Sequence, residues 1–354
     1  MVINSSFWES KKILLTGHTG FKGSWFTILL LKLGAEVCGY SLEPKNKEDL
    51  FYKIYPHISK KIKHNLGDIR DEERLKYLVN EYQPDFVFHF AAQPLVIESY
   101  KDPISTWNTN VIGSLNLLES LKKIDKKCSV IVITTDKVYL NKEWDFGYRE
   151  NDTLGGFDPY SASKAAVELL LNSWRLSFSF QYENLSLASA RAGNVIGGGD
   201  WSENRIIPDV IRALKNKQNI RVRNPNSTRP WQHVLEPLVG YLLQAEKMYK
   251  STDNYETSFN FGPNANSNRK VSELVNQILK VWKGNWVLEK NNFSDLHEAN
   301  LLYLNIDKAT KLLGWEPKWD FNKTVYKTIK WYYEVENGKD AFEKTLEDIN
   351  DFLI

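Results

Sequence analysis

Cysteine is scarce in this chain, since Cys38 and Cys128 are its only two among 354 residues. Two cysteines are too few for a disulfide framework, and their spacing suits no metal site. Both lie in apolar runs. We therefore expect two small buried side chains and no bound metal.

An excess of charge and a long apolar run are also missing. Lys and Arg number 46 against 44 Asp and Glu, so the overall charge favours neither nucleic acid nor a membrane as a partner. The longest apolar run, residues 25–31, is far shorter than the roughly 20 residues that cross a bilayer. Residues 1–12 are polar and lack the apolar core of a signal peptide. We expect a cytoplasmic protein.

The first half of the chain alternates two kinds of segment. Short β-type apolar runs cover residues 12–16, 36–40, 85–90 and 129–134, and stretches of helical spacing cover residues 22–33, 71–81 and 103–123. This alternation indicates parallel strands joined by crossover helices. We predict an α/β fold with a Rossmann-type doubly wound parallel sheet.

Beyond about residue 190 the alternation gives way to loops and separate helical segments, at residues 234–249, 271–282, 307–313 and 323–336. A chain of this length holds two domains more readily than one. We predict a sheet domain over residues 1–190, with a return segment near 230–262, and a smaller, mostly helical substrate domain over residues 191–354. Trp315 and Trp319 are expected in the core of the smaller domain.

A glycine-rich turn follows the first predicted strand, where residues 16–23 read Thr-Gly-His-Thr-Gly-Phe-Lys-Gly. Glycines three apart allow a tight turn, a close approach to a pyrophosphate and close packing of the next helix. The first N–H groups and the positive dipole end of that helix then face the phosphates. We predict a dinucleotide site whose loop contacts are Gly17, Thr19, Gly20, Phe21, Lys22 and Gly23.

Ser41 follows the second strand, and we expect it to bond a ribose hydroxyl because the next acidic residue, Glu43, comes late. No arginine lies nearby to hold an extra phosphate, which favours NAD over NADP. Residues 65–69 end what looks like a third strand, so that the runs at 85–90 and 129–134 are the fourth and fifth. Asp68, with Ile69 beside it, is placed to reach the adenine. The alternative for Asp68 is a turn aspartate that caps the next helix.

Tyr160 and Lys164 are four residues apart, so one helical face carries both. A free tyrosine has a pKa near 10, too high for a base at neutral pH. A nearby ammonium, together with the positive ring of the cofactor, favours the phenolate and lowers that pKa. We predict Tyr160 as the base and Lys164 as its partner.

The fifth strand leads into Thr135, Asp136 and Lys137, at the edge where a doubly wound sheet presents its chemistry. Thr135 is placed to hydrogen-bond the oxygen that Tyr160 deprotonates. Asp136 and Lys137 add an acid and a base that a simple dehydrogenase does not need. The alternative is a charged turn without a catalytic role.

Three further strings complete a resemblance to a known family. They are His-Phe-Ala-Ala-Gln at 89–93, Arg-Ala-Gly-Asn-Val-Ile-Gly-Gly-Gly-Asp-Trp at 191–201 and Thr-Arg-Pro-Trp-Gln-His-Val-Leu-Glu-Pro at 228–237. Together with the glycine loop and Tyr160, they make the chain resemble the extended short-chain dehydrogenases/reductases over nearly its whole length, and among these the nucleotide-sugar 4,6-dehydratases. Members acting on dTDP- or GDP-sugars usually carry Thr-Asp-Glu where this chain has residues 135–137. With a lysine at position 137, this chain resembles the branch of the family that acts on CDP-glucose.

The resemblance implies a redox-neutral reaction on CDP-glucose with bound NAD. Tyr160 removes the proton of the 4-hydroxyl while hydride passes from carbon 4 to NAD. Water then leaves from carbon 6, with Asp136 as the acid and Lys137 as the base at carbon 5 or as a group that orients it. Return of the hydride to carbon 6 gives CDP-4-keto-6-deoxyglucose, a precursor for deoxysugars of surface polysaccharides such as O-antigen.

The resemblance also implies roles for residues outside these motifs. The cofactor side is lined by Ala91, Ala92 and Gln93, and Asn110 orients the active-site groups. The diphosphate of the substrate is held by Asn194 and Arg229, with Arg205, Arg221, Arg223 and Arg269 as competitors that the sequence does not rank. His233 is expected to be structural. The implied assembly is a homodimer, or a dimer of dimers, paired through helices 103–123 and 160–180.

Two alternatives stay open. An epimerase or reductase of another nucleotide sugar needs Thr135, Tyr160 and Lys164 but gains nothing obvious from Asp136 and Lys137. A non-catalytic regulator that senses a dinucleotide commonly lacks the tyrosine, which this chain keeps.

Overall fold

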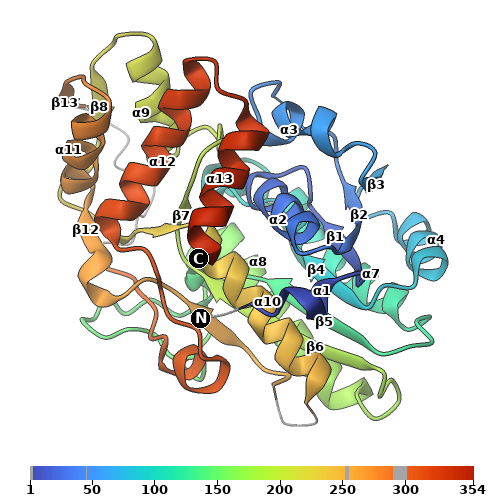
Figure 1. Cartoon of the computed structure of the whole chain (residues 1–354). Helices are drawn as coiled ribbons and strands as arrows, with labels where there is room; N and C mark the ends of the chain where they lie inside the picture. Colours follow the sequence, from blue (N-terminus) through green and yellow to red (C-terminus); the bar gives the residue numbers. More distant parts are fainter. Residues whose placement is uncertain (1–2, 45, 252–254, 290–300) are drawn as a thin grey trace.

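The centre of the molecule is a seven-stranded sheet, in which every neighbouring pair of strands is parallel (Figure 1). The computed structural model describes residues 3–44, 46–251, 255–289 and 301–354. In sheet order the strands are β11 (Phe259–Phe261), β6 (Leu185–Ala192), β5 (Cys128–Ile133), β4 (Phe86–His89), β1 (Lys12–Thr16), β2 (Glu36–Ser41) and β3 (Ile62–Leu66). The predicted doubly wound parallel sheet is confirmed. Its strand order reverses between β1 and β4, and ligands of such sheets bind at this reversal, beyond the carboxyl ends of the strands.

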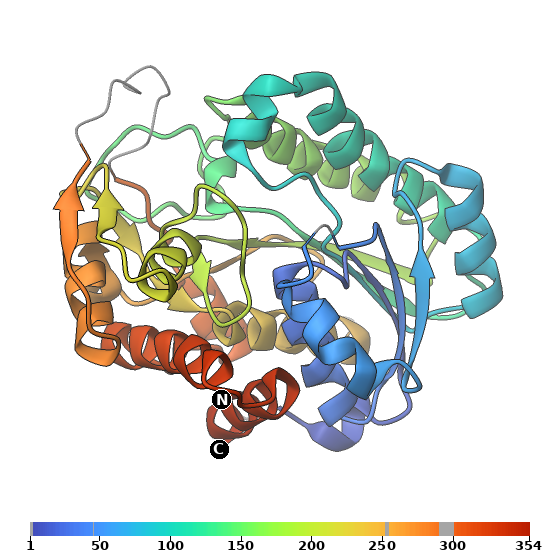
Figure 2. The same cartoon turned by 90° about the horizontal axis from the view of Figure 1, so that it is seen from above.

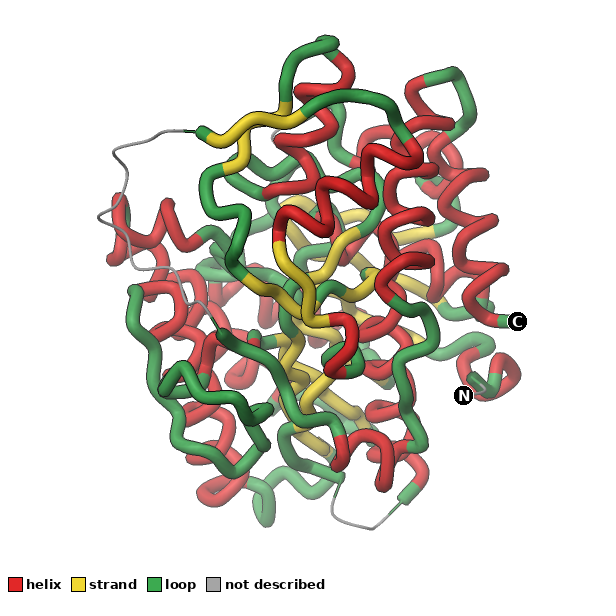
Figure 3. Tube along the Cα trace, turned by 90° about the vertical axis from the view of Figure 1, so that its left-hand side faces the viewer, coloured by secondary structure: helices red, strands yellow, loops and turns green. Residues whose placement is uncertain are grey.

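Helices cover both faces of the sheet, because successive residues of a strand point to opposite sides. Ile13 and Leu15 of β1 pack in the larger apolar cluster, whereas Leu14 between them packs in the second one. The larger cluster contains α2 (Phe21–Lys32) and α10 (Leu235–Lys250), and the second contains α4 (Glu72–Tyr82), α7 (Gly113–Leu121) and α8 (Pro159–Phe178). Figures 2 and 3 show these helical layers on the two sides of the strands.

The helix predicted over residues 103–123 contains a wider turn. α6 (Pro103–Trp107) leads into a π-helical turn, Asn108–Ile112, and α7 follows directly. Single π turns of this kind are frequent at functional sites. Here the turn carries Asn110, whose side chain is buried.

The chain after β6 builds a group of smaller elements. These are the strand pairs β7 (Val195–Ile196) with β10 (Gln232–His233), β8 (Ile220–Val222) with β13 (Trp286–Leu288) and β9 (Thr228–Pro230) with β12 (Asn268–Lys270), and the helices α9 (Ile206–Lys215), α11 (Val271–Val281) and α12 (Phe321–Glu336). Figure 1 places α9, α11, β8 and β13 at the side of the molecule away from β3 and α4. The helices without a counterpart among the predicted segments are α1 (Ser5–Trp8), α3 (Leu50–Ile58), α5 (Val96–Lys101), α9 and α13 (Ala341–Leu353).

The packing bears on the predicted division into two domains. The boundary at residue 190 falls inside β6, and the segment 230–262 contains α10, which packs against β5 and β6, and β11, which is an edge strand of the sheet. Trp315 and Trp319 are buried, but in the apolar cluster that also holds Trp25 of α2. Trp315 packs edge-on against Phe261 of β11. The two-domain division stays a prediction.

Both cysteines are buried free thiols, as predicted. Within the described ranges, no helix is long and apolar enough to cross a membrane. In the same part of the chain, no three or more His, Cys, Asp or Glu side chains are grouped so that they could hold a metal ion.

Candidate active site

The glycine loop connects β1 to α2, and at two of its glycines the backbone packs too closely to admit a side chain. Gly17 has φ +74°, and a Cβ atom there would lie 2.7 Å from the backbone nitrogen of Ala91. A Cβ atom on Gly23 would lie 2.2 Å from the carbonyl oxygen of Gly17. Gly20 is the N-cap of α2 and offers no side-chain acceptor to the first N–H groups of the helix. These groups and the open loop fit the pyrophosphate of a dinucleotide.

The neighbouring strand ends form the rest of this cofactor region. The hydroxyl of Thr19 lies 2.8 Å from that of Ser41 and donates to the carbonyl of Leu42 at 2.9 Å. The amide of Asn110 binds the backbone of Gln93 on both sides, accepting from its N–H at 2.8 Å and donating to its carbonyl at 3.2 Å. Ala91 and Ala92 follow β4 on the same loop. The structure therefore brings most of the predicted cofactor residues together.

Asp68 and Ile69 lie at the turn after β3, and two features of this turn differ from what the sequence predicted. The carboxylate of Asp68 accepts from the N–H and the guanidinium of Arg70, so an arginine does lie nearby, but it is paired with Asp68. Helix α4 is capped by Asp71 instead, which accepts from the backbone N–H of Arg74. Ile69 is buried against the helix that begins at Gly113.

Tyr160 and Lys164 lie in the first two turns of α8, and both are buried. The N-cap Asp158 begins this helix by accepting from the backbone N–H of Ser161. The ammonium of Lys164 donates to the carbonyl of Ile133 at the end of β5 at 3.0 Å. Tyr160 is hydrogen-bonded to Thr135, which also follows β5. The candidate base Tyr160 and the end of β5 therefore lie together, as their positions in the sequence predict.

The pKa of Tyr160 is set mainly by its burial. Burial raises it to about 12, and the hydrogen bond with Thr135 opposes this only in part. Burial also lowers the pKa of Lys164 to about 8, while the charge of Glu168 opposes that change. The predicted lowering depends on the positive ring of the cofactor together with the lysine, and it stays a prediction; in the protein alone, desolvation dominates.

Asp136 is buried in a short 3-10 turn, Asp136–Val138, capped by Thr135. It accepts from the Thr135 hydroxyl at 3.0 Å. Burial raises the pKa of its carboxyl group, and the charges of Lys137, Lys22 and Arg229 oppose the shift. A protonated carboxyl group is what a general acid requires.

Gly193 supplies the space that this carboxyl group occupies, which the sequence argument did not identify. A Cβ atom at Gly193 would lie 2.7 Å from Oδ2 of Asp136. The signal for it lay in the string at 191–201, where Gly193 precedes the exposed Asn194.

The arginines considered for the substrate diphosphate fall into two groups. Arg205 pairs with Asp200 at 3.0 Å, and its charge acts on Lys22. Arg229 lies close enough for its charge to lower the pKa of Asp136. These two arginines therefore face the candidate active site.

Of the other three arginines, two are exposed and one pairs with an acidic side chain. The Arg221 side chain is 76% exposed on β8, and Arg223 is exposed just beyond that strand. Arg269 pairs with Glu273 at 3.5 Å, although its backbone lies opposite Arg229 in the β9–β12 pair. His233 is buried and makes ring contacts with Trp25 and Trp319, which supports its structural role.

The fold and the site define an extended short-chain dehydrogenase/reductase. The profile of the family described as GDP-mannose 4,6 dehydratase matches residues 14–328. The chain belongs to this family.

Several relatives are similar over almost the whole chain. The CDP-glucose 4,6-dehydratase of Salmonella typhimurium is 42% identical, over 99% of this chain and 99% of its own. A UDP-glucose 4-epimerase of Halalkalibacterium halodurans is 27% identical, over 94% of this chain and 98% of its own.

Among solved structures, a dTDP-glucose 4,6-dehydratase of Bacillus anthracis in complex with NAD has a TM-score of 0.74 at 21% identity, over 93% of this chain and 98% of that one. A UDP-glucose 4-epimerase of Thermotoga maritima has a TM-score of 0.78 at 22% identity, over 92% and 99%. At this identity the two structures show the shared fold.

Proposed function

We propose that the chain is a CDP-glucose 4,6-dehydratase, which converts CDP-glucose to CDP-4-keto-6-deoxyglucose and water. One observation carries the proposal: the full-length similarity to a CDP-glucose 4,6-dehydratase coincides with a buried Asp136 beside Tyr160, where an oxidoreductase without a dehydration step needs no second acid. The enzyme is then a hydro-lyase with tightly held NAD.

Tyr160 would remove the proton of the 4-hydroxyl, with Thr135 bonded to the same oxygen. The glycine loop and Asn110 would hold NAD, which would supply reversible hydride transfer and a positive charge near the tyrosine. Because burial raises the pKa of Tyr160 to about 12, the base function depends on positive charge placed close to its oxygen. Lys164 contributes such a charge from the next turn of α8.

The 4-keto group acidifies the proton on carbon 5, which Lys137 would remove. Asp136 would give its proton to the 6-hydroxyl as this leaves as water, and burial raises the pKa of its carboxyl group, which favours the protonated form. Lys137 then returns a proton to carbon 5, and the proton taken by Tyr160 passes to Asp136 through solvent. The sugar therefore loses one water and no electrons, and both groups return to their starting state. Lys137→Ala tests the base role, since it should stop the reaction after oxidation at carbon 4, whereas an orienting lysine would only slow the dehydration.

The substrate diphosphate would bind Arg205, Arg229 and Asn194, since a guanidinium pairs with two phosphate oxygens.

A homodimer would form through α6, the π turn and α8. Exposed apolar side chains support this interface, namely Ile104, Trp107, Ile112, Leu169 and Leu176. The free thiols Cys38 and Cys128 suit the cytoplasm, where thiols stay reduced. The product would feed deoxysugar synthesis, for instance of O-antigen.

The test is incubation of the purified protein with NAD and CDP-glucose, followed by mass spectrometry of the nucleotide sugar. The expected result is the loss of one water without net reduction of NAD. Parallel incubations with dTDP-, GDP- and UDP-glucose test the nucleobase. An unchanged mass with all four sugars would favour an epimerase instead.

A further inference from the structure

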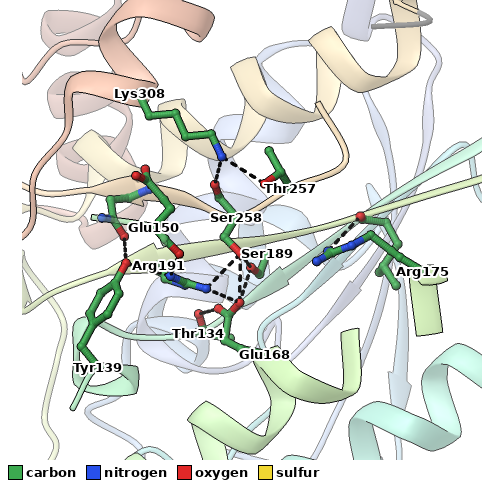
Figure 4. Close-up of polar contacts among 12 residues, drawn as sticks. Thr134, Tyr139, Glu150, Glu168, Arg175, Ser189, Arg191, Thr257, Ser258 and Lys308 are labelled. Carbon is green, nitrogen blue, oxygen red and sulfur yellow. Dashed lines mark hydrogen bonds and ion pairs between the residues drawn. The ribbon is translucent and has the colours of Figure 1, made fainter. Parts of the chain in front are cut away.

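Glu168 and Arg191 form an ion pair (Figure 4). Glu168 follows Lys164 by one turn on α8, and Arg191 lies near the end of β6. Both side chains are almost completely buried, and Nη2 of Arg191 is 2.9 Å from Oε2 of Glu168.

The carboxylate of Glu168 also binds the strand ends. One oxygen accepts from the hydroxyl of Thr134 at 2.6 Å, directly before Thr135. The other accepts from the hydroxyls of Ser189 and Ser258 at 2.7 and 3.1 Å. The Glu168 side chain thus joins α8 to β5, β6 and the start of β11 (Figure 4).

Arg191 extends the connection to the loop that follows Asp136. Its Nη1 donates to the hydroxyl of Tyr139 at 2.8 Å and to the carbonyl of Glu150 at 3.0 Å. Tyr139 in turn donates to Asn260 at 2.7 Å. All three segments that carry the proposed chemistry, α8, the end of β5 and the end of β6, therefore meet at this one pair.

We infer that Glu168 and Arg191 are positioning residues, which hold Tyr160, Thr135 and Asp136 in register and keep Lys164 cationic. Glu168 is the negative charge on the same helix face as the Lys164 ammonium. It is itself ionised, since the charge of Arg191 helps to hold its pKa below the usual range. The inference rests on the proposed function only for its activity readout.

The charge can be removed with little change in shape. In Glu168→Gln the amide oxygen can still accept from Arg191, and the amide NH₂ can donate to Thr134, because a hydroxyl group both donates and accepts. Glu168→Asp keeps the charge with a shorter side chain. The matched control is Asp348→Asn in α13, which removes another buried acid, paired with Lys344 at 2.6 Å on the opposite face of the sheet.

The first readout needs no substrate: the pH titration of the ε-carbon resonance of Lys164 by NMR in lysine-labelled protein, assigned with Lys164→Met. Wild-type Lys164 is expected to titrate near the value to which burial lowers its pKa, about 8. Glu168→Gln should lower that midpoint by about one pH unit or more, as expected for the loss of an opposite charge. Glu168→Asp should restore most of it, and Asp348→Asn should leave it unchanged.

The second readout is the pH profile of kcat, whose alkaline limb should move to lower pH in Glu168→Gln alone. A Lys164 midpoint and a pH profile equal to those of the wild type, with only a lower Tm as in Asp348→Asn, would overturn the inference and leave the pair a purely structural contact. If no nucleotide sugar is turned over, the proposed function fails, and the NMR titration still decides this inference.

Discussion

Gly193→Ala tests whether the position of the Asp136 carboxyl group matters for the reaction. The added Cβ atom would lie 2.7 Å from Oδ2 of Asp136 and 3.3 Å from its Cγ. Since ordinary contact begins near 3.4 Å, one of the two groups must move by about 0.7 Å. Asp136 is buried and bonded to Thr135, so it cannot swing into solvent. A misplacement approaching 1 Å costs up to about 100-fold in rate. We expect kcat to fall by about 10- to 100-fold.

Folding should change little in this variant. Gly193 does not have a positive φ, so alanine is compatible with its backbone, and a lower entropy of the unfolded chain offsets part of the crowding. The matched control is Gly262→Ala beyond β11, whose Cβ would meet only side-chain atoms, the nearest at 3.3 Å on Leu304. Steady-state kinetics and thermal unfolding are measured for both variants. Wild-type kcat in Gly193→Ala, or an equal loss in both variants, would refute the reasoning.

Three further perturbations follow from the structure. Gly23→Ala places a Cβ atom 2.2 Å from a backbone oxygen, so calorimetry should show NAD binding lost, and stability should fall by about 1–3 kcal/mol from overpacking. Arg205→Ala should raise KM for CDP-glucose by about 10- to 100-fold through the loss of a charged hydrogen bond. Arg221→Ala should leave KM unchanged. Equal effects of the two substitutions would contradict the placing of Arg205, and not Arg221, at the substrate diphosphate. Burial raises the pKa of Glu236 to about 7, so the folded state holds this proton more tightly than the unfolded state. Its contribution to stability then falls as pH rises from about 4.5 to 7, by on the order of 3 kcal/mol. Glu236→Gln should remove this slope in urea unfolding, and a slope equal to that of the wild type would contradict the assignment.

The first half of the fold was predictable because strand and helix periods alternate clearly there. The glycine loop and Tyr160 were predictable for a related reason, since short local strings specify them. The later helices were harder to predict. α3 and α13, for example, pack against α2 and each other across the whole length of the chain, and such long-range packing leaves a weak local signal.

The parts of the site that the sequence did not reveal depend on contacts between segments that are far apart along the chain. Glu168 and Arg191 are 23 residues apart along the chain, and neither stands out within its own segment. The close approach of Gly193 to Asp136 depends on β5 lying beside β6. The pKa of Tyr160 depends on how deeply α8 is buried, which a spacing of four residues does not give.

The most direct test of the account follows a deuterium label placed on carbon 4 of CDP-glucose. The protein is incubated with the labelled sugar and NAD, and the product is examined by mass spectrometry and NMR. The account predicts a sugar that has lost one water and carries the deuterium in its new methyl group at carbon 6. Deuterium retained on carbon 4 of an isomer with unchanged mass, or accumulating in reduced NAD, would contradict it.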